Sequence, residues 1–443
     1  MKKAPVPLKY AMLTIVVILS LYVLFSGLIY FICRKKTVPL SWQQCALFLG
    51  IKIVAGSAYG YIYGRYYHGD DTWGLNHDAW LQYQRLLHTP ALFFKDLFSA
   101  HPTPGMGLYF QDDLTYMEQL EHALTTKILA PFNCISQGNY YINIVFFSFL
   151  SFWGAYFLYK LLTEQLYTPM SANKKRESSP IPAPAHSRTF APISVSISVF
   201  LFLPALFWLS GIRAEGLLLL FTGALLYYFR QWITKPRLVN TFLCLISLAI
   251  LFILRNSFAL SLLPALAAWW LCVRFNTNPL KAFGGIYGGL VILLAISSFL
   301  PPPYSLLRPI VQRQQSFLSL HGNTRFNLTP LEYNISSFLL VAPEALVNTL
   351  LRPWPWEAKG ALQWLVALEN IVLWGLIIAC LARYGKQLQN VFTHPLAWLL
   401  LFVALSNYLF IGYVVPFPGA IVRYRVLPEL FLLCLLALAW KKK

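Results

Sequence analysis

The stretch that decides the fold class is MKKAPVPLKYAMLTIVVILSLYVLFSGLIYFIC, residues 1–33. Its part from 10 to 33 carries no charged residue. A helix that crosses a bilayer needs about 20 apolar residues, so this run is long enough. It is too long for the apolar region of a secretory signal, and no small-residue cleavage motif follows it. We therefore expect a retained transmembrane helix.

The composition extends this expectation to the whole chain, which is 58% hydrophobic and only 12% charged. A soluble domain has roughly 45–50% apolar and about 25% charged residues. The net charge of +19 lies mainly in short clusters between apolar runs. That distribution is typical of the positive-inside rule, whereas a nucleic-acid-binding protein gathers its positive charge on one face. We expect an all-α polytopic membrane protein with no nucleic-acid partner.

The apolar runs predict a single integral membrane domain over 1–443 with about eleven transmembrane helices. These are expected at 10–33, 40–63, 140–162, 190–211, 214–230, 239–254, 257–273, 282–300, 361–382, 395–413 and 424–440.

Lysine and arginine in the connections predict the orientation. With eleven helices, six basic clusters fall on one side, which is then cytoplasmic: 34–36, 173–188, 230–237, 274–281, 383–386 and 441–443. Residues 163–189 are expected to form a flexible, basic cytoplasmic loop. The outer side receives two large loops, 64–139 and 301–360, and each contains a segment expected to form an interfacial helix. These segments are 75–98, interrupted by Pro90, and 336–351, interrupted by Pro343.

The first outer loop opens with YYHGDDTWGLNHDAW, residues 66–80. Asp70 and Asp71 have two interpretations: a solvated helix cap, or a general base at the membrane surface. Asp78 follows Asp71 by about two helical turns, so the two carboxylates share a helix face if the helix begins early enough.

Acidic residues and histidines in this loop also raise the question of a metal. The candidates are His68, His77, Asp112, Asp113, Glu118, Glu121 and His122. No HExxH motif or zinc-ligand spacing is present, so we assign no metal ligands. A Mg²⁺ or Mn²⁺ ion held by Asp70, Asp71 or Asp78 together with a phosphate stays open as an alternative.

Arginines recur in the outer turns, several with an acidic neighbour. SGIRAEG holds Arg213 and Glu215, RPWPWE holds Arg352 and Glu357, and the set is completed by Arg255, Arg423 and Arg425. Singly, each is explained as an interfacial anchor. Together, arginines on one face opposite an acidic loop indicate an anion site, because guanidinium binds phosphate through two parallel hydrogen bonds.

These motifs resemble those of the GT-C class of polytopic membrane glycosyltransferases, especially bacterial members of the Bacteroidetes type. The resemblance rests on four short stretches spread over most of the chain: 69–78, 208–216, 352–357 and 419–425. The chain departs from the pattern in its extra aspartate, in the arginine of SGIRAEG and in an additional helix before the acidic loop. The resemblance implies a GT-C-like fold and a catalytic aspartate at Asp71 or Asp70. It also implies substrate contacts from Asp78, His77, Arg213, Glu215, Arg255, Arg352, Glu357, Arg423 and Arg425.

The function that the resemblance implies is sugar transfer, with inversion, from a polyprenyl-phosphate donor to a glycan, lipid or protein acceptor. The expected location is the periplasmic face of a bacterial inner membrane. Two alternatives are retained: a polysaccharide polymerase or ligase, and a lipid or polysaccharide flippase or carrier. A carrier would place ionisable residues at mid-bilayer, where the sequence offers mainly Lys52.

Overall fold

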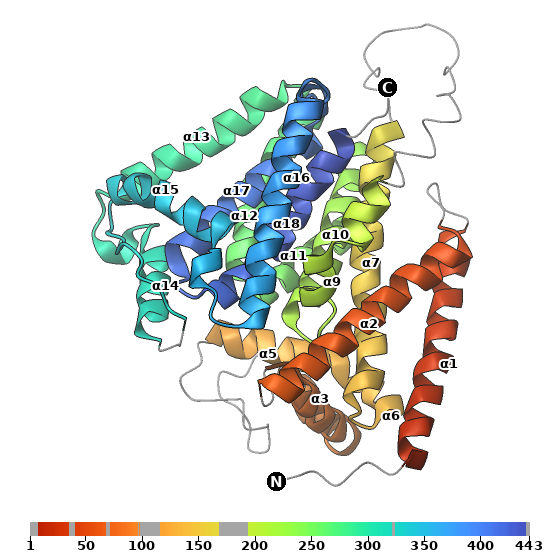
Figure 1. Ribbon diagram of the computed structural model, residues 1–443. Helices are drawn as coiled ribbons and strands as arrows, with labels where there is room; N and C mark the ends of the chain where they lie inside the picture. The colour runs from red at the N-terminus through yellow and green to blue at the C-terminus, as the bar shows by residue number, and fades with distance from the viewer. Residues whose placement is uncertain are drawn as a thin grey trace, which may run out of the picture. The chain divides into compact units, whose positions relative to one another are not determined.

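The computed structural model describes residues 8–34, 40–67, 71–95, 97, 116–167, 194–320 and 324–439. Within these ranges every regular element is a helix (Figure 1). Eight helices are long and apolar enough to cross a membrane: Met12–Cys33, Trp42–Tyr66, Tyr140–Glu164, Ala214–Thr234, Asn256–Phe275, Pro279–Ser297, Ala361–Val391 and Pro395–Val414. The prediction of an all-α polytopic membrane protein is confirmed at this level.

Three of the eleven expected segments differ from the other eight. Residues 190–211 are interrupted, because a helix over 194–200 ends before Pro204 and a short helix begins at Leu203. The segment 239–254 forms a helix of 17 residues. The segment 424–440 belongs to a helix that carries three charged residues and an internal Pro428. A count of eleven spans therefore stays a prediction.

The chain divides into two compact units, whereas its apolar runs predict a single domain over 1–443. Unit 1 lies within Met1–Ser178 and Val199–Asn256, and unit 2 within Ser179–Ser198 and Ser257–Lys443. The helices of unit 1 are α1 (Leu8–Cys33), α2 (Trp42–Tyr66), α3 (Asp71–His88), α4 (Pro90–Lys95), α5 (Tyr116–Leu129), η2 (Ala130–Phe132), α6 (Asn133–Ser136), α7 (Tyr140–Tyr167), α9 (Leu203–Trp208), α10 (Ala214–Thr234) and α11 (Leu238–Leu254).

In unit 1, the long helices α2, α7, α10 and α11 pack side by side, and close backbone approach holds α7 against α10. A Cβ added at Gly223 of α10 would lie 2.2 Å from the carbonyl oxygen of Gly154 in α7. The helices α3, α5 and α6 gather where α2 ends and α7 begins (Figure 1). Within this group the chain breaks between α3 and α4 at Thr89, as Pro90 predicts.

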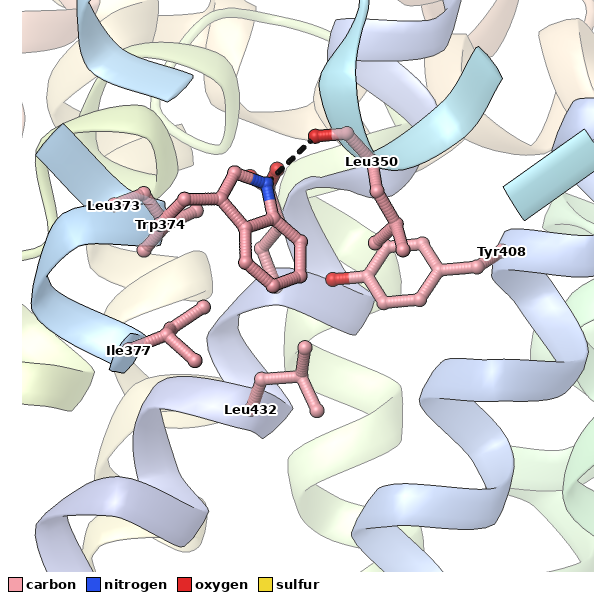
Figure 2. A pocket seen from close by; sticks show the side chains of 7 residues that line it. Leu350, Leu373, Trp374, Ile377, Tyr408 and Leu432 are labelled. Atoms are coloured by element: carbon pink, nitrogen blue, oxygen red, sulfur yellow. Dashed lines mark hydrogen bonds between the residues drawn. The ribbon is translucent and has the colours of Figure 1, made fainter. Parts of the chain in front are cut away.

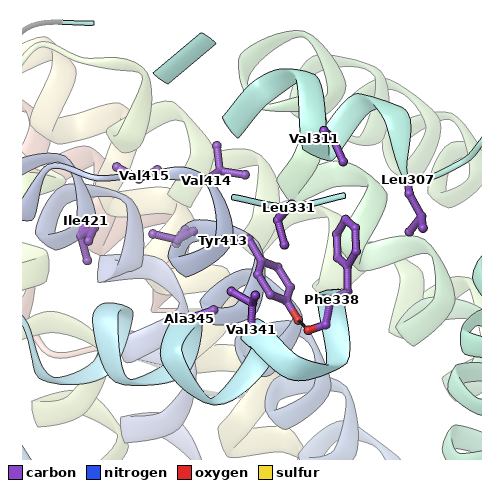
Figure 3. Packing of buried hydrophobic residues seen from close by; sticks show 11 residues of the cluster. Leu307, Val311, Leu331, Phe338, Val341, Ala345, Tyr413, Val414, Val415 and Ile421 are labelled. Atoms are coloured by element: carbon purple, nitrogen blue, oxygen red, sulfur yellow. Dashed lines mark hydrogen bonds between the residues drawn. The ribbon is translucent and has the colours of Figure 1, made fainter. Parts of the chain in front are cut away.

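Unit 2 contains α12 (Asn256–Phe275, apart from its first residue), α13 (Pro279–Ser297), η3 (Pro302–Tyr304), α14 (Arg308–Ser319), α15 (Ile335–Leu351), η4 (Pro355–Glu357), α16 (Ala361–Val391), α17 (Pro395–Val414) and α18 (Pro418–Ala439). The expected interfacial segment 336–351 is α15, which packs on α17. Figure 3 shows the apolar cluster between α14, α15 and α17, in which the Tyr413 hydroxyl donates to the carbonyl of Phe338 at 2.7 Å.

Candidate functional site

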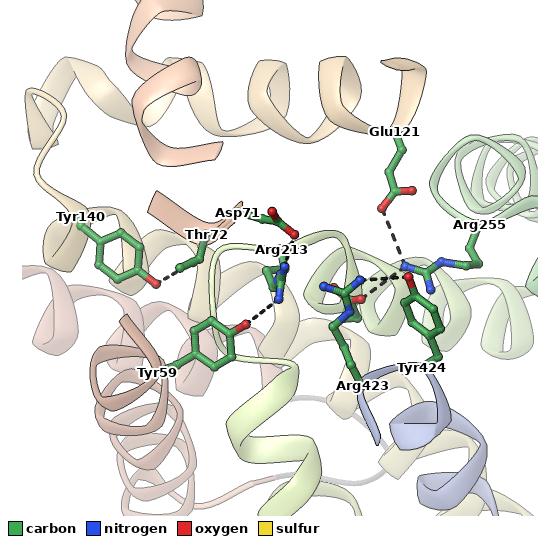
Figure 4. A network of polar contacts seen from close by, with 10 residues as sticks. Tyr59, Asp71, Thr72, Glu121, Tyr140, Arg213, Arg255, Arg423 and Tyr424 are labelled. Carbon is green, nitrogen blue, oxygen red and sulfur yellow. Dashed lines mark hydrogen bonds and ion pairs between the residues drawn. The ribbon is translucent and has the colours of Figure 1, made fainter. Parts of the chain in front are cut away.

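The centre of the candidate site is an ion pair between Asp71 and Arg213 in unit 1 (Figure 4). Asp71 is the first residue of α3, where the helix dipole favours a negative charge. Arg213 is the N-cap of α10. The Arg213 side chain is 5% exposed and that of Asp71 is 63% exposed. The second terminal nitrogen of Arg213 donates to the Tyr59 hydroxyl at 2.7 Å. A buried cation thus fixes a carboxylate that solvent or a substrate can reach.

Glycines of α2 and of the turn before Arg213 allow this arrangement. A Cβ at Gly211 would lie 2.6 Å from the Tyr59 ring, and one at Gly60 would lie 2.1 Å from the Tyr140 ring. The Gly60 carbonyl accepts the indole N–H of Trp73 at 2.9 Å, and this indole stacks on Tyr140. The start of α3 is therefore held against α2 and α7 within three residues of Asp71.

A second charged group surrounds Arg255, the C-cap of α11. Its guanidinium lies 3.3 Å from Glu215, in the first turn of α10, and 3.8 Å from Glu121 of α5. Glu215 is nearly buried, whereas Arg255 and Glu121 are partly exposed. Figure 4 shows Glu121 reaching Arg255 from a helix far away in sequence. The sequence analysis identified Arg255 and Glu121 as candidates, but it did not predict that they contact each other.

The side chains of Asp78 and His77 lie in different environments on α3. The Asp78 carboxylate is buried and lies 2.9 Å from Nε2 of His122 in α5, whereas His77 is exposed. Asp78 therefore joins α3 to α5 and faces a different partner from Asp71. Two residues before Asp78, buried Asn76 accepts from Asn143 of α7 at 2.8 Å, which joins α3 to α7 as well.

Four expected site residues belong to unit 2. Arg352 lies 3.1 Å from Glu357, and its guanidinium sits 3.9 Å from the ring centroid of Phe326. Arg423 donates to the Tyr424 hydroxyl at 3.0 Å.

Arg425 is fully buried and is enclosed by groups of the protein itself. It donates to the carbonyls of Thr349 and Arg352 at 2.8 and 2.7 Å and to the side chain of Asn370, and it pairs with Glu429 at 2.6 Å. These contacts give Arg425 a role in holding α15, α16 and α18 together. This geometry does not support the expected contact between Arg425 and a substrate phosphate. Of Arg423 and Arg425, Arg423 is therefore the stronger candidate for phosphate binding.

Some expected residues lie outside the described part of the chain: Asp70, His68, Asp112, Asp113, most of the cluster 34–36, the cluster 173–188 and the cluster 441–443. Among the described residues, no group of three or more His, Cys, Asp or Glu side chains is arranged to hold a metal ion. Asp71 and Asp78, two of the three carboxylates considered for a divalent cation, contact Arg213 and His122 instead.

Unit 2 also contains a small cavity of about 10 Å³, room for roughly one water molecule (Figure 2). Apolar side chains line most of it, with the Trp374 indole donating to the Leu350 carbonyl at 2.9 Å. Tyr408 and Glu429 supply its polar groups. This volume is far below the roughly 300–1,000 Å³ of a typical ligand pocket, so the cavity is no substrate site.

Sequence reasoning missed Tyr59 and Glu429. Tyr59 sits between glycines in a helix with many aromatic residues, and nothing local distinguishes it. Glu429 had a usable signal, because it follows Arg425 by four residues, the spacing of a helical ion pair, and it is the one acidic residue of α18.

Comparisons with known proteins add no identification: no family model, curated protein or solved structure matches the chain.

Proposed function

We propose that the protein is a membrane glycosyltransferase that moves a sugar from a polyprenyl-phosphate donor to an acceptor hydroxyl. The observation that carries the proposal is the exposed Asp71 carboxylate fixed on the buried Arg213 guanidinium. A catalytic base must be accessible and held in one orientation, and this pair provides both properties. The four motifs that resemble those of GT-C enzymes add to it, and they extend the proposal to a GT-C-like fold with about eleven spans.

In the proposed reaction, the Asp71 carboxylate takes the proton of the acceptor hydroxyl. The acceptor oxygen then bonds to the anomeric carbon, the bond from that carbon to the phosphate oxygen breaks, and polyprenyl phosphate leaves with the electron pair. Positive charge near the leaving phosphate lowers the barrier. Arg255 suits this task because it is partly exposed and its ion pairs of 3.3 and 3.8 Å are longer than the best charge-assisted hydrogen bonds, about 2.7–2.9 Å.

The test uses the full-length protein in nanodiscs with a panel of synthetic polyprenyl-phosphate monosaccharides and membrane glycolipid acceptors. Release of polyprenyl phosphate is measured for the wild type, for Asp71→Asn and Asp70→Asn, and for the double variant. Glu164→Gln is the matched control, because Glu164 also forms an ion pair, 3.7 Å from Lys160, at the opposite end of α7 from Tyr140.

We expect the double variant to lose all release, with Asp71→Asn accounting for most of the loss and the control unchanged. Normal release in the double variant, while the protein still elutes as a folded species, would falsify the proposal. Reporter fusions at positions 70, 180 and 320 test the orientation, with 70 and 320 expected in the periplasm and 180 in the cytoplasm of a bacterial cell.

One observation favours the carrier alternative. Charged side chains buried within apolar helices include Lys52 in α2, Lys160 in α7 and the Arg425–Glu429 pair in α18, and such residues often mark transport pathways. Lipid extraction separates the two functions. A strain with an inactive enzyme accumulates undecorated acceptor at the outer face, whereas a strain with an inactive carrier retains the lipid-linked precursor inside.

A further inference from the structure

Unit 2 contains a carboxylate, Glu369 of α16, that the proposed reaction does not use. The residue lies about 12 Å along the helix from Ala361, within an apolar segment long enough to cross a membrane. Its Oε1 atom is buried and has no hydrogen-bond partner among the described residues. Glu369 interacts electrostatically with both Arg425 and Glu429 of α18. It therefore adds a third charged group to the enclosed Arg425–Glu429 pair.

The three groups do not balance in charge if all of them are ionised. Arg425 supplies one positive charge, whereas Glu429 and Glu369 together supply two negative charges. Arg425 already pairs with Glu429 at 2.6 Å, and its other hydrogen bonds go to Asn370 and to backbone carbonyls. Two carboxylates beside one guanidinium in a water-poor interior are costly to ionise together, because like charges repel and lack hydration. One negative charge of the cluster is therefore in excess.

The other elements packed against α16 do not remove this excess within the described ranges. The 3₁₀ turn η4 carries Glu357, but the charge of Glu357 is balanced by Arg352 at 3.1 Å. The end of α15 meets α16 through backbone carbonyls, which accept from Asn370 and Trp374. The charge that surrounds Glu369 is therefore that of the α18 pair.

A second observation comes from the small cavity of Figure 2. Tyr408 of α17 is 1% exposed, and its hydroxyl points into the cavity with no hydrogen-bond partner among the described residues. Glu429 lines the same cavity, and so does Leu373, one helical turn after Glu369. A phenol hydroxyl both donates and accepts, so it can pass a proton. The cavity has room for roughly one water molecule, and its mainly apolar lining lacks the about six oxygen ligands that a metal cation prefers.

We propose that Glu369 and Glu429 form a proton-binding site in unit 2, in which two carboxylates share one proton and one guanidinium. The proton comes from water, bonds to one carboxylate oxygen and leaves the cluster electrically neutral. Carboxyl groups of this kind form proton relays inside membrane proteins. This inference goes beyond the proposed function and does not rest on it, because it assigns reversible proton binding to helices that the sugar-transfer reaction does not use.

Glu344 of α15 illustrates the alternative, which is a carboxylate that stays ionised. Both Glu344 and Glu369 are partly buried residues of unit 2. The Glu344 carboxylate accepts hydrogen bonds from the backbone N–H and the hydroxyl of Thr329, and such bonds stabilise its charge. The buried Oε1 of Glu369 has no such donor. Glu344→Gln is therefore the matched control for Glu369→Gln.

The test records infrared spectra of the full-length protein in nanodiscs and follows the C=O band of a protonated carboxylic acid. We expect this band in the wild type at neutral pH and its loss at alkaline pH. Either Glu369→Gln or Glu429→Gln removes the excess charge, so the band should disappear in both variants and persist in Glu344→Gln. In D₂O the band should shift more slowly in Tyr408→Phe, because the hydroxyl that passes the proton is missing.

A second measurement needs no variant. Dicyclohexylcarbodiimide reacts with protonated carboxyl groups in apolar surroundings, and mass spectrometry should locate its adduct on Glu369 or Glu429 of the wild type. Labelling should fall as the pH rises. Asp71→Asn should keep both the band and the labelling, since neither requires turnover. A protein that shows both but transfers no sugar would contradict the proposed function and leave this inference standing.

Three outcomes overturn the inference. The first is the absence of the acid band from the wild type at neutral pH. The second is an unchanged band in Glu369→Gln, which would assign the proton to another group. The third is loss of the band and of the labelling when sodium chloride replaces choline chloride, which would identify a sodium site instead.

Discussion

Arg213 of unit 1 and Arg425 of unit 2 are both almost inaccessible, but their guanidinium groups have different surroundings. Arg425 contacts only buried or backbone groups, including its own counter-ion Glu429, which is 4% exposed. Arg213 contacts buried Tyr59 on one side and the exposed Asp71 on the other. A fully enclosed charge serves the fold, whereas a buried charge that orients an accessible one can serve chemistry. We therefore expect substitution of Arg425 in unit 2 mainly to lower stability, and substitution of Asp71 in unit 1 mainly to lower activity.

The largest expected effect on stability is that of Arg425→Met. Removing one member of a buried ion pair leaves the other uncompensated, which costs about 3–5 kcal/mol. We expect a large fall in the melting temperature of the detergent-solubilised protein, followed by fluorescence-detected size exclusion after heating. Arg423→Met is the control, since Arg423 is only partly buried.

The double variant Arg425→Met/Glu429→Met tests the cause of that loss. Replacing both charges with apolar side chains removes the uncompensated charge, so it should recover much of the melting temperature. If the double variant is as unstable as the single one, the enclosed pair is not the source of the effect.

Gly412 of unit 2 and Gly60 of unit 1 extend the comparison of the two units from charge to packing. A Cβ at Gly412 would lie 1.9 Å from the Ala345 carbonyl oxygen, whereas one at Gly60 would meet the Tyr140 ring. Overpacking costs about 1–3 kcal/mol, and backbone cannot rotate aside as a side chain can, so Gly412→Ala should lose more stability. Gly60→Ala should instead lose activity, because Tyr140 bonds to Thr72, the neighbour of Asp71.

The control for both substitutions is Gly284→Ala, where a Cβ would meet nothing within 4 Å. This variant should be neutral or slightly more stable, since alanine favours a helix over glycine. Equal losses at Gly412 and Gly284 would mean that backbone approach between α15 and α17 is not what the glycine allows.

The parts of the structure that local sequence determines could be predicted, and they include most of the fold. Eight long apolar runs form candidate spans, and Pro90 separates α3 from α4 as expected. Asp71 and Arg213 were both identified, because charges are rare in this chain and these two stand in polar turns. What they contact was not predictable, since the pair joins residues 142 positions apart.

The enclosure of Arg425 shows why the rest could not be predicted. In the sequence, Arg423 and Arg425 are two arginines of one motif, and both were assigned to a phosphate. Their environments differ because Asn370, 55 positions away, and the end of α15 surround only Arg425. Burial of a polar side chain depends on such distant partners, which a single sequence without an alignment does not reveal.

A smaller effect on stability is expected for Asp71→Asn. The asparagine carbonyl can still accept from the buried Arg213, and the Asp71 side of the pair is exposed to solvent, so the loss should be about 1 kcal/mol. Transfer activity should nevertheless disappear, because an amide cannot take the acceptor proton. The melting temperature of Asp71→Asn is measured together with that of Arg425→Met. If both variants lose a similar amount of stability, Asp71 is a structural partner of Arg213 rather than a base.

The smallest expected effect belongs to Glu121→Gln. Its carboxylate lies 3.8 Å from Arg255, and both side chains are partly exposed, so the pair should contribute less than about 1 kcal/mol. The same weakness would let a phosphate displace Glu121 from Arg255. We therefore expect unchanged thermal stability but a lower KM for the polyprenyl-phosphate donor, since a competing carboxylate is removed. A raised KM with unchanged kcat would show instead that Glu121 holds Arg255 in its working position.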